Sequence, residues 1–376
     1  MGLQMAVGIS MPLKNDFDQI EQLIRQLLYL EEDNVIVRIV YASYLANLVK
    51  GPPVWLMVLG PPSCGKTELI MTLCKAQRSM VYSTISAAAL LSGYDSDVSI
   101  LNPKANGKVL IVGDMSTMIT GNKERLGEAL GMLRHLYDGR VIRPTGKELL
   151  EFEGKVGFMA ACTPDIDEYR EFMASLGERY LYVKMRHQPE DKVFERVLQN
   201  TSVFVQLQET IRIAASMLVK KFQPAKSVQL LSSTESLIKD TSSIMARIRT
   251  RVERDRYTKE IVNVPQFSEG PIRIYKQLLR IVMAAQMLGA NDAELDAILL
   301  RFAWDSIPEA RARVLSALVK HSAINTKQIQ LILKVSYNRT RQIVEDLVQL
   351  GMLEKRGTTF GIPNQTLVRA TAKWAQ

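Results

Sequence analysis

The sequence predicts an α/β protein in which a parallel five-stranded sheet precedes a helical region and a small C-terminal unit. Two observations support this fold class. Short apolar runs alternate with segments of helical spacing up to about residue 185, which is typical of a layered α/β fold. Beyond about residue 190 these runs stop, and residues 190–299 have mainly helical periodicity.

Five runs are short and apolar enough to be parallel strands buried on both faces. They span residues 54–60, 80–85, 108–113, 155–162 and 180–185. Helix-compatible segments lie between them at residues 66–78, 86–92, 122–137 and 166–176. Two further helices are expected before the first strand, at residues 16–30 and 34–49.

We divide the chain into four parts. They are an N-terminal helical segment (1–50), an α/β core (51–189), a helical region (190–299) and a C-terminal unit (300–376). The helical region contains one polar, serine-rich stretch, residues 223–243, where we expect a break between helices.

Composition limits the class of protein. The formal net charge of +9 favours an anionic partner, nucleic acid first and a membrane surface second. The three scattered cysteines fit reduced thiols, and the chain shows neither a signal peptide nor a transmembrane run. We therefore expect a cytoplasmic protein without a membrane partner.

The stretch GPPSCGKT matches the phosphate-binding pattern G-x-x-x-x-G-K-[ST], between a predicted strand and a predicted helix. In this pattern the glycines let the backbone wrap around phosphate oxygens, and the amides at the helix start attract them. Lys66 would neutralise the β- and γ-phosphates, and the Thr67 hydroxyl would bind Mg²⁺. The predicted nucleotide-binding residues are Gly60, Pro61, Pro62, Ser63, Cys64, Gly65, Lys66 and Thr67.

Two polar residues follow other predicted strands. Asp114 comes at the end of the run KVLIVG, and Thr163 follows the strand of residues 155–162. Because ligands bind at the carboxyl ends of parallel strands, Asp114 is a candidate metal ligand, and Thr163 could orient an attacking water.

Three further features complete the pattern. Asp138-Gly139 and a later PTG turn predict a β-hairpin just before the Thr163 strand. Arg179 directly precedes the last predicted strand, and Arg273 begins a helix in the helical region, from which it could close over the phosphates. A guanidinium can stabilise the transition-state charge of phosphoryl transfer.

These residues, in this order, resemble the AAA+ ATPases over about residues 35–295. The hairpin resembles that of the presensor-hairpin clade, which includes the minichromosome-maintenance helicases. The stretches SAAALLSG and SLGERY look like ATPases of phages and mobile elements. The resemblance implies ATP and Mg²⁺ as cofactors, Thr163 as sensor 1, Arg179 as a finger acting on the neighbouring subunit, Arg273 as sensor 2, and a ring, often a hexamer.

The chain departs from the family pattern at GDMSTM, because no glutamate follows Asp114. In a first register Asp114 is the metal carboxylate and Met115 replaces the general base, so that Glu124 or Glu128 would have to activate water. In a second register Gly113 replaces the metal carboxylate and Asp114 is the base. We expect the first register and, in either case, slow hydrolysis that depends on a partner.

The C-terminal unit has the layout of a winged helix-turn-helix domain. Thr326 can cap a short helix, Ser336 a longer one, and two short strands follow around Arg356-Gly357. The longer helix would present Tyr337, Asn338, Arg339 and Arg341 to DNA, and the wing would add Lys355 and Arg356. Winged helices also bind proteins, which leaves that alternative open.

Together these features predict a DNA-binding AAA+ ATPase, a helicase or helicase-like motor in phage or mobile-element DNA replication. Arg140, Arg143 and Lys147 of the hairpin would grip DNA in the centre of the ring. One alternative is an ATP-switched DNA-binding regulator or helicase loader with little intrinsic hydrolysis. Another is a protein remodeller whose winged helix binds a protein.

Overall fold

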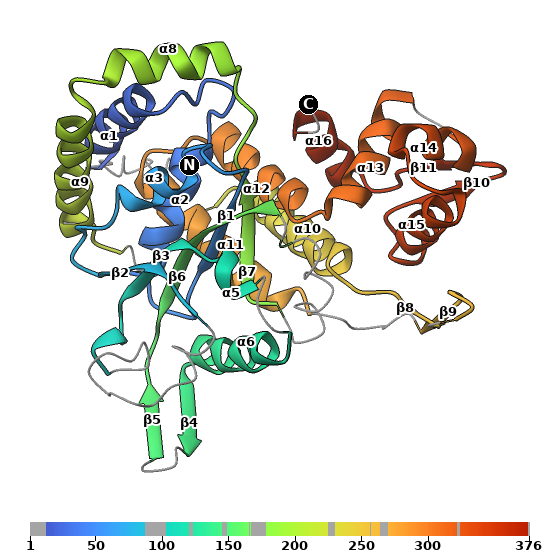
Figure 1. The fold of residues 1–376 in the computed structure, drawn as a ribbon, viewed down its shortest axis with the longest axis horizontal. Helices are drawn as coiled ribbons and strands as arrows, with labels where there is room; N and C mark the ends of the chain where they lie inside the picture. Colours follow the sequence, from blue (N-terminus) through green and yellow to red (C-terminus); the bar gives the residue numbers. More distant parts are fainter. Residues whose placement is uncertain are drawn as a thin grey trace, which may run out of the picture.

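A computed structural model describes residues 13–86, 103–119, 123–144, 149–164, 166, 178–224, 230–255, 257–263, 270–321 and 324–374. At its centre lies a parallel five-stranded sheet with the order β2–β3–β6–β1–β7 (Figure 1). These strands are β1 (Trp55–Leu59), β2 (Ser79–Thr84), β3 (Val109–Asp114), β6 (Gly157–Cys162) and β7 (Tyr180–Lys184). The predicted α/β fold and its five strands are confirmed.

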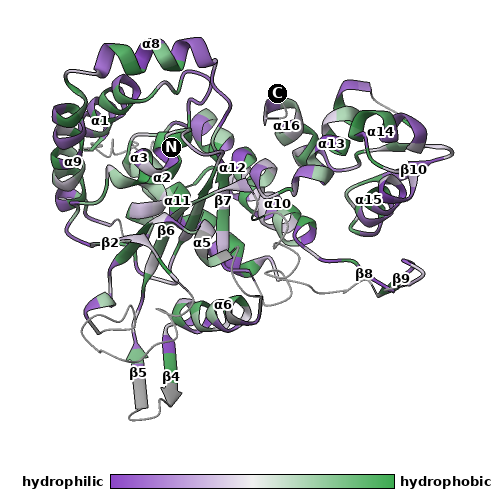
Figure 2. Cartoon of the chain, in the orientation of Figure 1, coloured by the Kyte–Doolittle hydropathy of each residue, from purple (hydrophilic) through white to green (hydrophobic). Residues whose placement is uncertain are grey.

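Helices cover both faces of this sheet. On β3, Val109 and Ile111 belong to one apolar core, which includes α2 (Ile36–Ala46), α3 (Lys66–Met71) and α11 (Ile272–Met287). Their neighbours Leu110 and Val112 belong to a second core formed with α6 (Lys123–Asp138). The inner strands β1, β3 and β6 are accordingly mostly hydrophobic in Figure 2, because both of their faces are buried. The edge strand β2 is only partly buried.

The N-terminal helices are confirmed as α1 (Lys14–Leu27) and α2. In Figure 1, α1 lies beside α8 (Glu190–Asn200) and α9 (Phe204–Lys221), the first helices after the sheet. The predicted helices at 86–92 and 166–176 lie almost entirely outside the described residues. The predicted hairpin is confirmed as β4 (Arg140–Pro144) and β5 (Leu149–Glu153), which pair antiparallel.

Two expectations about the helical region are wrong. Most of the expected break at 223–243 is helical, because α10 spans Ser232–Ile248 and buries Leu237, Ile238, Ile244 and Met245 on one face. This apolar face outweighs the weak helix preference of the serines. The region also contains strands: β8 (Glu253–Arg254) and β9 (Ile261–Asn263) form a hairpin between α10 and α11.

The predicted boundary at residue 300 falls inside α12 (Asp292–Asp305), and the part of the C-terminal unit beyond this helix has the predicted element order. It comprises α13 (Glu309–His321), α14 (Thr326–Leu333), α15 (Tyr337–Gln349), β10 (Glu354–Arg356), β11 (Thr359–Gly361) and α16 (Gln365–Trp374). Ser336 caps α15 as expected, whereas Asn325, not Thr326, caps α14 through a reciprocal capping box with Gln328. No helix in the described ranges is long and apolar enough to cross a membrane.

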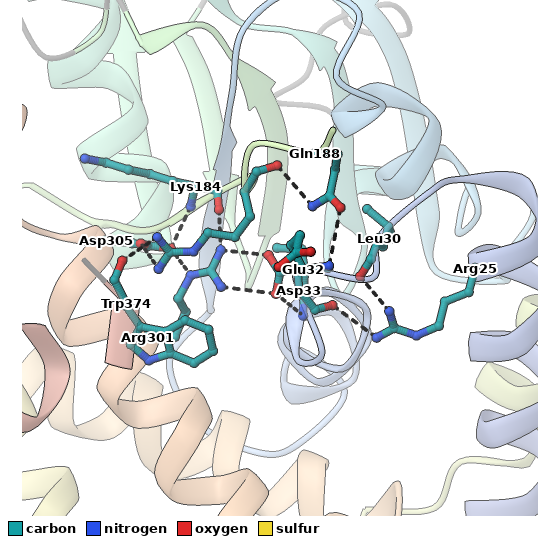
Figure 3. Close-up of polar contacts among 11 residues, drawn as sticks. Arg25, Leu30, Glu32, Asp33, Lys184, Gln188, Arg301, Asp305 and Trp374 are labelled. Carbon is teal, nitrogen blue, oxygen red and sulfur yellow. Dashed lines mark hydrogen bonds and ion pairs between the residues drawn. The ribbon is translucent and has the colours of Figure 1, made fainter. Parts of the chain in front are cut away.

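A buried ionic cluster ties distant parts of the chain together (Figure 3). The Arg301 guanidinium of α12 donates to both carboxylate oxygens of Asp33 at 3.1 and 2.8 Å, and to Asp305 at 2.6 Å. Asp305 also accepts the backbone N–H of Lys184, the last residue of β7, at 2.7 Å. Arg301, Asp33 and Asp305 are almost fully buried. Their contacts connect the segment before α2 and the last strand of the sheet to α12.

A second pair of cations, the buried Arg280 and the half-buried Lys155, lies near the C-terminus of α2. The Lys155 ammonium donates to the carbonyl of Val49 at 2.7 Å, and the Arg280 guanidinium donates to the same oxygen at 3.0 Å. Burial, together with the charge of Arg280, lowers the pKa of Lys155 to about 7. The folded protein therefore holds the Lys155 proton less tightly than the unfolded chain does.

We expect Lys155→Met to stabilise the protein most below pH 7. The unfolded chain retains the lysine proton up to about pH 10.5, so wild-type stability rises as pH increases from about 7 toward 10.5. After solvent screening of this half-buried group, the gain in Tm at pH 6 should be about 2–4 °C. Thermal unfolding at pH 6, 8 and 9.5 measures the gain in Tm. A gain that does not depend on pH would show that the lowered pKa of Lys155 is not its cause.

Candidate functional site

The GPPSCGKT loop joins β1 to α3 at the carboxyl edge of the sheet. Ser63 and Gly65 have positive φ angles of 62° and 86°, and a Cβ at Gly60 would lie 2.5 Å from the sulfur of Cys64. The backbone therefore forms the tight cradle that the pattern predicts. The Lys66 ammonium donates to the Pro61 carbonyl at 2.9 Å and so lies across the loop.

The donors of this loop fit a polyphosphate with a bound Mg²⁺. Lys66 supplies a cation that donates to a neutral carbonyl, and the start of α3 supplies backbone amides. The Thr67 hydroxyl is exposed at the same place and donates to the Gly113 carbonyl at 3.1 Å. Within the described ranges no three His, Cys, Asp or Glu side chains gather for a metal.

Asp114 and Thr163 both contact Ser116, a residue that was not among the predicted site residues. The Ser116 N–H donates to the Asp114 carboxylate at 2.8 Å. The Ser116 hydroxyl lies 3.2 Å from the Thr163 hydroxyl and accepts the Thr163 N–H at 3.2 Å. Because β3 and β6 are neighbours, the structure brings both predicted residues to one edge, and Ser116 links them. The only sequence signal for Ser116 was its place in GDMSTM.

The directions of the β3 side chains favour the second register over the one we expected. Side chains alternate along a strand, and Gly113 shares its face with Ile111, on the α3 side. A Cβ at position 113 would lie 3.1 Å from Cε of Met71 in α3. The β3 position that faces α3, the helix that contains Thr67, is thus a glycine. Asp114 points to the opposite face of the sheet, where Met115 is buried in the core formed with α6.

Cys162, which precedes Thr163, does not supply a nucleophile at neutral pH. Burial raises the pKa of its thiol to about 12, and the nearby Asp114 carboxylate acts in the same direction. The thiol therefore stays protonated, and the reactive polar groups of this edge are the hydroxyls and the Asp114 carboxylate.

Arg179 and Arg273 lie together at the opposite, amino edge of the sheet. Arg179, only 9% exposed, pairs with Asp138 at 3.3 Å. Arg273 donates to the Glu178 carbonyl at 3.1 Å, and both guanidinium groups stack over the Tyr137 ring. Tyr137 itself packs against Trp55, the first residue of β1. Arg273 therefore does not close over the loop of its own chain as we expected, because α11 packs on α2 and places it beside Arg179.

The predicted DNA-binding residues fall into two groups. Arg140 is exposed at the base of the β4–β5 hairpin, which projects from the amino edge (Figure 1), whereas the Arg143 side chain and Lys147 lie outside what the structure describes. The second group is exposed on the C-terminal unit: Tyr337, Asn338, Arg339 and Arg341 on α15, and Lys355 and Arg356 on β10. The possible bases Glu124 and Glu128 are exposed on α6.

The chain matches no known protein family model, and no curated protein is significantly similar to it. Its function is therefore inferred from the geometry of these residues.

Proposed function

We propose that the protein is an AAA+ ATPase that binds ATP with Mg²⁺ and works on DNA as a ring, expected to be a hexamer. The observation that carries this proposal is the strand order. β6 lies between β1 and β3, so the GPPSCGKT loop, Asp114 and Thr163 share the carboxyl edge. A water between Asp114 and Thr163 would then lie near the γ-phosphate that Lys66 holds.

The placement of the arginines supports a ring. Arg179 and Arg273 lie at the amino edge, across the sheet from the loop of their own chain. In a head-to-tail assembly, the amino edge of one subunit would face the carboxyl edge of the next, so both guanidinium groups would approach the neighbour's phosphates. Each ATP site would then need two subunits.

The C-terminal unit supports DNA as the substrate. Three helices, the β10–β11 hairpin and a bridge between Ile324 and Phe360 support the proposal of a winged helix-turn-helix domain. Its second helix, α15, begins with exposed polar and basic side chains suited to base edges and phosphates. We therefore propose a helicase or helicase-like motor in phage or mobile-element DNA replication.

Gly113 favours a second candidate, an ATP-switched DNA-binding regulator or helicase loader with little intrinsic hydrolysis. In the second register no carboxylate follows β3 on the side that faces α3, so Mg²⁺ would lose one of its usual protein ligands. ATP would still bind the GPPSCGKT loop, but turnover would be slow.

Turnover of ATP measured with single-stranded and with duplex DNA separates the two candidates. DNA-stimulated hydrolysis that disappears in Lys66→Ala would support the motor. Tight ATP binding without turnover under every DNA condition would support the switch, and absence of ATP binding would overturn both.

We expect Asp114→Asn to lower turnover by about 10²–10⁴-fold without changing the Kd for ATP, because Asp114 is placed as the general base. Steady-state turnover at several Mg²⁺ concentrations checks this. The matched control, Met115→Leu, conserves the volume of the buried neighbour and should leave turnover nearly unchanged. If a raised Mg²⁺ concentration restored the turnover of the Asp114→Asn variant, Asp114 would be a metal ligand, in line with the first register.

A further inference from the structure

The β8–β9 hairpin between α10 and α11 has no part in the proposed ATP site. Its turn carries Tyr257, whose side chain is 86% exposed, and β9 carries Val262, which is 68% exposed. The β8–β9 hairpin projects from the rest of the chain in Figure 1. Exposed apolar side chains are common singly, but an aromatic ring on such a hairpin offers a flat, accessible surface.

The hairpin is fixed to α15 by one arginine. The Arg254 guanidinium donates to the Asp346 carboxylate at 2.6 Å, to the Glu345 carboxylate at 3.1 Å and to the Gln342 carbonyl at 3.1 Å. Its side chain is only 13% exposed, so these contacts are partly shielded from water and salt. The hairpin therefore holds a defined position against the middle of α15.

This anchor joins the turn of the hairpin to the exposed face of α15. Arg341 pairs with one oxygen of Glu345 at 3.0 Å, and the other oxygen of Glu345 accepts from Arg254. The same Arg254 nitrogen donates to the backbone carbonyl of Lys259 at 2.8 Å. The exposed cations Lys259 and Arg341 thus belong to one surface, although 82 residues separate them (341 − 259).

The turn itself is shaped to present Tyr257 outward. The Asp255 carboxylate accepts the N–H groups of Tyr257 and Thr258, each at 2.7 Å, and these bonds lower the pKa of Asp255. Lys259 has a left-handed φ of 60°. The backbone therefore engages the carboxylate of Asp255, and Tyr257 and Lys259 are both exposed, as are Thr258 and Glu260 beside them.

We propose that the β8–β9 hairpin binds single-stranded nucleic acid, with Tyr257 stacking on an unpaired base and Lys259 contacting an adjacent phosphate. Stacking platforms beside cations are how proteins hold single strands without reading their sequence. The exposed Glu253 and Glu260 nearly neutralise the hairpin itself, so the cations of α15 supply most of the attraction and Tyr257 supplies the stacking. The inference rests on DNA as the substrate of the proposed function.

Binding of the full chain to a fluorescent oligothymidylate, measured by anisotropy at fixed salt, tests this role. Tyr257→Ala should weaken binding about 5- to 150-fold, which corresponds to the loss of one stacked base, and Tyr257→Phe should bind like wild type. Val205→Ala, which alters an exposed side chain on the distant helix α9, is the matched control. Duplex affinity, which depends on α15 and the wing, should change little in any of these variants.

The outcomes distinguish this inference from the proposed function. If wild type binds DNA but Tyr257→Ala binds the single strand as well as wild type does, the role of the hairpin is overturned and the proposed DNA-binding function is not. If wild type binds neither form at low salt, the DNA-binding function fails and the hairpin role with it. Photocrosslinking to an oligonucleotide containing 5-iododeoxyuridine should place the adduct on Tyr257, and an adduct found only elsewhere would also overturn the role.

Discussion

The Arg179→Ala variant is expected to turn over ATP about 10³–10⁵-fold more slowly than wild type, with little change in ATP affinity. This is the effect expected when an arginine stabilises the transition-state charge from the neighbouring subunit. The geometry supports such a role, because Arg179 lies at the amino edge with Arg273 beside it and away from its own loop. Turnover and equilibrium ATP binding, measured on the same preparation, check the expectation.

A mixing experiment distinguishes action on the neighbour from a structural role. Lys66→Ala and Arg179→Ala subunits should each be inactive alone. Mixed together they should regain part of the turnover, because a wild-type loop can meet a wild-type arginine across an interface. Asp138→Asn removes only the 3.3 Å partner of Arg179 and serves as the control for local distortion. No recovery, together with a monomer by sedimentation in the presence of ATP, would contradict the ring.

The Arg301→Met variant should lose about 3–5 kcal/mol of stability, because it leaves the buried carboxylate of Asp33 without this cation. It also removes the nearer arginine of Asp305, at 2.6 Å, whereas Arg186 stays at 3.8 Å. Both carboxylates are at most 1% exposed, and Arg301 is fully buried between them (Figure 3). Urea unfolding followed by circular dichroism measures the loss.

The matched control for this prediction is an exposed ion pair whose carboxylate lies on the same helix as Arg301. Arg369 of α16 pairs with Asp296 of α12 at 3.0 Å, but its side chain is 53% exposed. Arg369→Met should therefore cost only about 0–1 kcal/mol. Equal losses in the two variants would show that burial does not set the strength of the α12 ion pairs.

Much of the fold was predictable because its signals are local. Each buried strand of the sheet is a continuous apolar run, and the GPPSCGKT loop is a contiguous pattern whose glycines set its backbone conformation. The α10 helix shows the limit of composition. Its serines suggested a loop, but a stripe of buried apolar side chains that includes Leu237, Ile238, Ile244 and Met245 outweighs their weak helix preference. The β8–β9 hairpin was missed because its strands contain only two and three residues.

The sequence by itself determined the strands, the phosphate-binding pattern and the hairpin before β6, because each depends on residues adjacent along the chain. Only the tertiary structure decided which residues meet. The strand order brought Asp114, Ser116 and Thr163 together, and the alternation of side chains along β3 turned Gly113 rather than Asp114 toward α3. The packing of α11 on α2 placed Arg273 beside Arg179 instead of over the loop of its own chain. These relations arise from contacts between residues far apart in sequence, which no local pattern encodes.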